Sequence, residues 1–82
     1  MLAARYTKIR RRTNQQRMYA LLVAPTLWGT VALVRRWGRI GVNRPRELAL
    51  EFATEAEAET AFRREARHRR QRGYRRTRAD ED

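Results

Sequence analysis

The segment at residues 35–41, Arg-Arg-Trp-Gly-Arg-Ile-Gly, places a tryptophan among arginines. If the segment is a strand, Arg35, Trp37 and Arg39 project from one face, because alternate side chains of a strand share a face. An indole between two guanidinium groups suits a nucleic-acid strand, since the ring offers a flat apolar surface and arginine binds phosphate. Two simpler interpretations stay open: Trp37 fills the space between a sheet and a helix, and Arg39 is a solvated strand residue.

Further arginines follow this segment. Arg44 and Arg46 lie across the next turn and either extend the basic surface or belong to a solvated loop. The stretch 63–72 contains six more arginines with Glu65 as its only acidic residue, and such a cluster is either a binding face or a solvated helix face. The candidate DNA-binding residues are therefore Trp37, Arg39, Arg35, Arg44, Arg46 and Arg70.

The overall charge indicates an anionic partner. The 82 residues include 20 basic and 9 acidic side chains, which gives a formal net charge of +11, and every basic residue except Lys8 is arginine. This surplus favours nucleic acid, either DNA or RNA, ahead of anionic lipid or an acidic protein. A chain of this length forms one domain at most.

Catalytic and metal chemistry find little support in the composition. The chain has no cysteine and a single histidine, His68, which excludes disulfides, thiol catalysis and a histidine-based metal cluster. Most acidic residues gather at 55–59 and 80–82, where helix capping and solubility account for them. No nucleophile, base and orienting group occur together. We expect no enzyme activity, no cofactor and no metal site.

An uncharged run at 18–34 resembles a membrane segment in composition. It is marginal in length for a span, and Pro25 and Gly29 divide it into two halves of strand length. We therefore expect no membrane partner. The first fourteen residues lack the apolar core of a secretory signal, which makes a cytoplasmic protein the expectation.

The elements that must position the candidate residues form a small α+β domain. Strands are expected at 18–23, 30–40 and 48–52, while 5–12 is either an edge strand or a disordered basic arm. The pattern predicts an antiparallel sheet of about four strands with one C-terminal helix packed on a face. This domain covers 1–74 and is followed by a charged, disordered tail at 75–82.

Capping residues mark both ends of the predicted helix. Thr54 and Glu57, three residues apart, match a capping box at its start, and Gly73 is placed to cap its end. Two other glycines have structural roles in the tryptophan segment. Gly38 leaves one side of the strand bare, so that another part of the chain can approach, and Gly41 opens the turn at 41–45.

The residues Trp37-Gly38-Arg39-Ile40-Gly41 resemble the signature of the WGR domain. That module occurs in poly(ADP-ribose) polymerases and as small free-standing proteins in bacteria, and the resemblance runs from Tyr19 to Tyr74. It implies DNA binding at breaks, with Trp37 against the sugar-phosphate backbone near a strand end. It also implies that Arg39 contributes to the same surface and to contacts with neighbouring domains.

The sequence departs from that family in two ways. It has no polymerase domain, so a signalling role of Arg39 would need a partner protein. The turn after Gly41 reads Val-Asn-Arg-Pro-Arg, where many relatives carry a further glycine and a glutamine. The loop contacts of the relatives therefore do not transfer directly to this turn.

Two functions follow as the main hypotheses, beside a third in which a small membrane-surface protein binds anionic lipid. The first is sequence-independent DNA binding, at strand breaks or ends. The second is a protein-interaction module that uses the sheet face or the Trp28 loop to bind an enzyme encoded elsewhere. For Trp28 itself we expect a packing residue or a loop cap. The sequence leaves the oligomeric state open.

Overall fold

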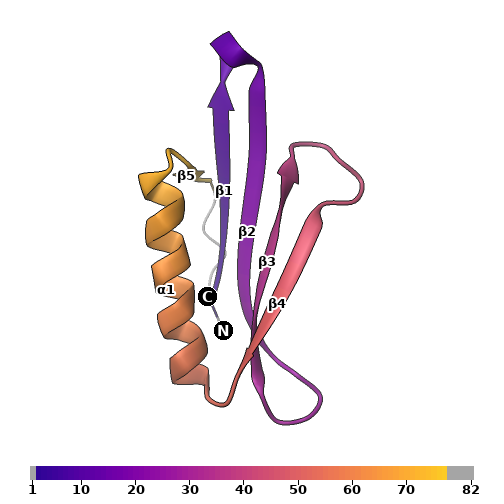
Figure 1. Ribbon diagram of the computed structural model, residues 1–82, viewed down its shortest axis with the longest axis vertical. Coiled ribbons are helices and arrows are strands. Elements are labelled where there is room, and N and C mark those ends of the chain that lie inside the picture. The colour runs from indigo at the N-terminus through magenta and orange to yellow at the C-terminus, as the bar shows by residue number, and fades with distance from the viewer. Residues whose placement is uncertain (1, 78–82) are drawn as a thin grey trace.

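The computed structural model describes residues 2–77. Within them, five strands form one antiparallel sheet in the order β4-β3-β2-β1-β5, and a single α-helix packs on one face (Figure 1). The elements are β1 (Ala3–Arg10), a 3₁₀ turn (Arg11–Thr13), β2 (Gln15–Pro25), β3 (Val31–Arg39), β4 (Arg46–Phe52), α1 (Glu55–Gln71) and β5 (Arg75–Arg76). The α+β class with a C-terminal helix is confirmed.

The expected count of about four strands is one too low, because the first and last basic segments both join the sheet. β1 pairs with β2 along its whole length, so residues 3–10 form a strand that is not at the edge. β5 pairs with β1 through Arg76 opposite Tyr6 and Arg75 opposite Thr7. The sheet therefore extends past residue 74, and residues 78–82 of the expected tail lie outside the described residues.

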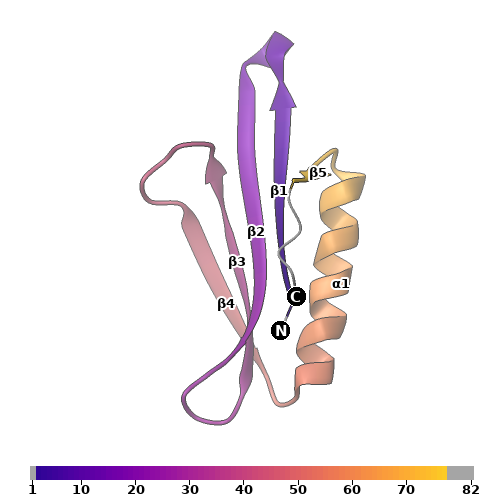
Figure 2. The same ribbon diagram turned by 180° about the vertical axis from the view of Figure 1, so that it is seen from behind.

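The core lies between the sheet and α1. Alternate residues of the strands face the helix, and the fully buried Leu21, Val23 and Leu33 pack there with Ala58 and Phe62 of α1. No other described element covers the opposite face (Figure 2). The period-two pattern of β2 and the apolar stripe of α1 thus account for a two-layer domain.

The helix ends as its capping residues predict. The Glu57 amide donates to the Thr54 hydroxyl at 3.2 Å. At the other end, Gly73 has a φ of +88°, and the Gly73 and Tyr74 amides donate to the Arg70 and Arg69 carbonyls. This C-terminal cap turns Tyr74 back toward the sheet, where it packs against the core.

The uncharged run at 18–34 forms most of β2, a loop and the start of β3. Among residues 2–77, no helix has the length and apolar character needed to cross a bilayer. The long axis of the domain measures 45 Å, and the β1–β2 turn and the β2–β3 loop lie at its opposite ends (Figures 1 and 2).

Candidate nucleic-acid interface

Trp37 stands on the helix side of the sheet and stacks on a core tyrosine. In the β2–β3 register it lies directly opposite Tyr19. The two ring centroids are 5.9 Å apart and the planes differ by 17°. Tyr19 is only 3% exposed, whereas Trp37 is partly buried. The indole therefore packs against the core through one face and leaves part of its surface to solvent.

Two arginines hold Tyr19 in place. Arg35 Nε donates a hydrogen bond of 2.8 Å to the Tyr19 hydroxyl and lies 3.9 Å from Glu65 Oε1. The Arg69 guanidinium lies 4.2 Å from the Tyr19 ring centroid and 5.4 Å from that of Tyr74. Both guanidinium groups are turned inward, so they support the aromatic stack from the side of α1.

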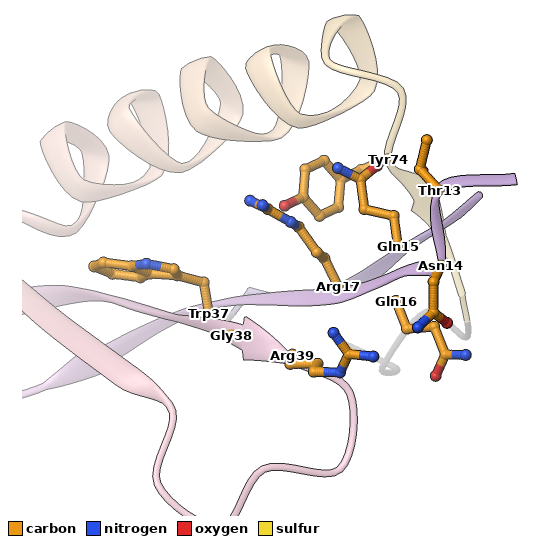
Figure 3. Close-up of a pocket in the computed structure, with 9 residues that line it drawn as sticks. All are labelled: Thr13, Asn14, Gln15, Gln16, Arg17, Trp37, Gly38, Arg39 and Tyr74. Carbon is orange, nitrogen blue, oxygen red and sulfur yellow. The ribbon is translucent and has the colours of Figure 1, made fainter. Parts of the chain in front are cut away.

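A groove of about 420 Å³ opens beside the indole, at the end of the sheet that carries the β1–β2 turn. We call it the hairpin groove. Figure 3 shows Arg17 and Trp37 pointing toward the helix side of the sheet, with the Arg39 guanidinium apart from the indole and nearer the end of the sheet. The residues that line the hairpin groove are Thr13, Asn14, Gln15, Gln16, Arg17, Trp37, Gly38, Arg39 and Tyr74.

A second groove of about 390 Å³, the turn groove, borders the same segment. It is bounded by the β3–β4 turn, which bends sharply where Gly41 takes a φ of +90°. Its lining residues are Arg17, Trp37, Gly38, Arg39, Val42, Arg44, Pro45 and Arg46. The two grooves share Arg17, Trp37, Gly38 and Arg39, which form the wall between them.

Gly38 allows the turn to close over β3. A Cβ atom at this position would lie 3.3 Å from Val42 Cγ2 and 3.6 Å from Pro45 Cα. The predicted close approach at Gly38 is therefore confirmed, and the approaching segment is the chain's own turn. This contact fixes the position of Arg44 and Arg46 relative to the tryptophan.

Both grooves are strongly electropositive. Arg17, Arg39, Arg44 and Arg46 line them, and no carboxylate does. The nearest acidic residue in sequence, Glu47, is on the opposite face of the sheet, where Arg36 Nη2 pairs with it at 2.7 Å. With no carboxylate lining either groove, the four guanidinium groups have the charge and the donor geometry that suit anionic oxygens.

The structure brings together four of the six candidate DNA-binding residues: Trp37, Arg39, Arg44 and Arg46. Arg35 is adjacent but points inward at Tyr19. Arg70 acts electrostatically on β1: burial raises the pKa of the Tyr6 hydroxyl, and the positive charges of Arg76 and Arg70 oppose the rise. Arg70 does not line either groove.

Sequence reasoning missed the part of the interface that comes from the β1–β2 hairpin and the helix end. The missed residues are Thr13, Asn14, Gln15, Gln16, Arg17 and Tyr74. For Arg17 a signal was present, because it is two residues before Tyr19 and so falls on the same face of the strand. In the β2–β3 register it lies opposite Arg39, which places two positive charges across the end of the sheet.

The chain is 39% identical over 62 residues to an uncharacterized protein, y4dW, of Sinorhizobium fredii. The match covers 76% of this chain and 30% of that protein, so the chain spans about a third of its relative's length. No solved structure matches the chain significantly. The family model of the WGR domain, a nucleic-acid-binding module associated with poly(ADP-ribose) polymerases, matches residues 3–81, nearly the whole sequence. The chain belongs to the WGR domain family.

Proposed function

We propose that the protein binds DNA without reading its sequence and prefers strand ends and nicks. The observation that carries this proposal is the position of Trp37 in the wall between two arginine-lined grooves. The hairpin groove and the turn groove would each hold a stretch of sugar-phosphate backbone. The indole between them would contact the sugar or base of the terminal nucleotide.

The phosphate contacts supply most of the affinity. Arg17, Arg39, Arg44 and Arg46 are exposed, and the planar guanidinium of arginine matches the geometry of phosphate oxygens. Each phosphate that is neutralised on duplex DNA contributes about −0.9 to the slope of log K against log salt, so four contacts give a slope of about −4. These contacts are the same for every base sequence.

The tryptophan supplies the preference for a break. Inside an intact duplex, each base is covered by its neighbours on both faces. At an end or a nick, the terminal nucleotide can offer a sugar or a base face to an aromatic ring. Trp37 is suited to this contact because Tyr19 backs it at 5.9 Å and holds its orientation before DNA arrives.

Fluorescence anisotropy with labelled DNAs tests the proposal. A hairpin-capped duplex, an open-ended duplex, a nicked duplex and an RNA duplex of the same sequence are titrated at several salt concentrations. We expect the open-ended and nicked DNAs to bind more tightly than the capped duplex, with a difference that persists as salt rises. Equal affinities that all vanish with salt would contradict end recognition and leave only a general positive charge.

A further inference from the structure

The β2–β3 loop displays two large apolar side chains at the end of the domain remote from the grooves. Leu27 is 94% exposed and Trp28 is 69% exposed, more than any other large apolar side chain in the described residues. Of the two roles expected for Trp28, a packing residue or a loop cap, the packing role does not fit this exposure. Because they are so exposed, the Leu27 and Trp28 side chains add nothing to the core of the domain.

The loop is held rigidly in this conformation. The Thr26 amide donates to the Thr30 carbonyl at 2.9 Å, and the two threonine hydroxyls are 2.7 Å apart. The Trp28 amide donates to the Thr26 hydroxyl at 3.3 Å, and Gly29 has a φ of +87°, which closes the turn. The apolar side chains are thus presented on a preformed turn, which lowers the entropy cost of binding a partner.

The Trp28 side chain is itself oriented by a hydrogen bond. Its indole Nε1 donates to Glu51 Oε1 at 3.3 Å, and the Thr30 hydroxyl donates to the same oxygen at 3.0 Å. The polar atom of the indole is therefore satisfied within the domain, while the ring stays exposed. A ring held in this way resembles the aromatic anchors that dominate protein–protein interfaces.

Charges at this end of the molecule select the kind of partner. Glu51 contacts the loop, and Glu55 lines an apolar hollow of about 210 Å³ beside it, with Val23, Ala24, Pro25 and Val31. The loop and the first turn of α1 lie together at this end in both ribbon views (Figures 1 and 2). Carboxylates beside exposed apolar side chains disfavour nucleic acid and anionic lipid, whereas they favour a protein surface with lysine or arginine around an apolar cleft.

We propose that Leu27 and Trp28 form a docking site for a second protein, whose surface has an apolar cleft rimmed with lysine or arginine. The site is at the opposite end of the 45 Å axis from the grooves, so the partner and DNA bind at the same time. This proposal goes beyond DNA binding and does not depend on it. The domain would then join a DNA site to a protein that acts there.

Photo-crosslinking in the cells that encode the protein is the first step of the test. Benzoylphenylalanine replaces Leu27 in one variant. In the control variant it replaces Ile9, which lies on β1 and is 59% exposed. After nuclease treatment, we expect one protein to crosslink from position 27 and not from position 9. Products from position 27 that are nucleic acid, lipid or a second copy of this chain would overturn the proposal, as would products that match those of the control.

The crosslinked protein is then identified by mass spectrometry, purified and titrated calorimetrically against the full chain. We expect Trp28→Ser and Leu27→Ser each to weaken binding about 30-fold, as loss of an interface anchor does. Glu55→Lys should also weaken binding of the partner protein, and this loss should grow as the salt concentration falls. Val42→Ser, at the opposite end of the domain, should leave binding of the partner unchanged.

We expect the two loop variants to keep the thermal midpoint and the DNA affinity of the wild type. Weaker binding of the partner protein would then be due neither to misfolding nor to loss of DNA binding. Equal affinity of wild type and both loop variants for the purified protein would overturn the proposal.

Discussion

Tyr19 stacks on Trp37 with a centroid distance of 5.9 Å, and the guanidinium of Arg69 lies 4.2 Å from the centroid of the same tyrosine ring. The buried tyrosine therefore links the partly buried tryptophan to the helix. The pairing explains how one strand can present an aromatic ring to solvent without leaving it free to rotate. The arginines near this pair fall into two groups: Arg35 and Arg69 support the aromatic stack, while Arg17 and Arg39 line the grooves.

Removal of the Tyr19 hydroxyl tests the arginines that support the aromatic stack. Tyr19→Phe keeps the ring stack but removes the acceptor of the 2.8 Å hydrogen bond from Arg35. We expect the free energy of unfolding, measured by urea denaturation, to fall by about 1 kcal/mol. Affinity for nicked DNA should change less than threefold, roughly, because the stack itself is retained. If Tyr19→Phe abolished the preference for nicked DNA, the hydroxyl and not the ring would be what orients the indole.

Replacement of Trp37 tests the aromatic contact itself. We expect Trp37→Ala to weaken binding to nicked and open-ended DNA about 10-fold, the loss of one stacking contact, with little change in the salt slope. Binding to the hairpin-capped duplex should change much less. Trp28→Ala is the matched control, because it removes a tryptophan that is 69% exposed at the opposite end of the domain. Equal affinity of wild type and Trp37→Ala for a DNA end would contradict the stacking role.

Three arginine variants test the phosphate contacts. We expect Arg39→Ala and Arg46→Ala each to reduce the magnitude of the salt slope by about 0.9, the contribution of one phosphate. Arg36→Ala removes the same charge from the same sheet, but on the opposite face, where Arg36 pairs with Glu47 at 2.7 Å. The slope of this variant should stay at the wild-type value. Equal losses in all three would mean that net charge, and not the grooves, governs binding.

Much of the fold follows from local patterns in the sequence. Residues 18–23 alternate, Thr54 and Gly73 cap the helix, and Gly41 opens a turn, and each of these signals depends only on near neighbours. β1 carries only a weak signal, because the apolar Ala4 and Tyr6 are followed mainly by basic and polar residues. Its burial, 1% and 2% exposed at these two residues, comes from pairing with β2 and contact with the helix layer. β5 is still harder to predict, since its two arginines form a strand only because their backbone pairs with that of β1.

The site shows the same division. Trp37, Gly38 and Arg39 could be recognised because they are contiguous and their residue types are unusual together. The inward roles of Arg35 and Arg69 could not, because they depend on Glu65, Tyr19 and Tyr74 from other elements. In a chain so rich in arginine, residue type alone does not separate a guanidinium that supports an aromatic ring from one that faces a ligand.

Gly38 offers a test of how the turn positions the grooves. Its Cβ position lies 3.3 Å from a methyl group of Val42, which is 42% exposed and can shift by a few tenths of an ångström. We therefore expect Gly38→Ala to change the unfolding free energy by less than about 1 kcal/mol. Gly38→Val directs further methyl groups at Pro45, whose backbone Cα is only 3.6 Å from the Cβ position. This overpacking should cost about 1–3 kcal/mol and displace the turn that carries Arg44 and Arg46.

The functional consequence of that displacement is a weaker hold on phosphate. We expect Gly38→Val to lower the magnitude of the salt slope, measured by anisotropy on nicked DNA, while the slope of Gly38→Ala stays near wild type. Because Val42 is the first obstacle, the double variant Gly38→Val/Val42→Ala should recover part of the lost stability and part of the slope. If the slope of Gly38→Val were unchanged despite its lower stability, Arg44 and Arg46 would not contact DNA from the position that the turn gives them.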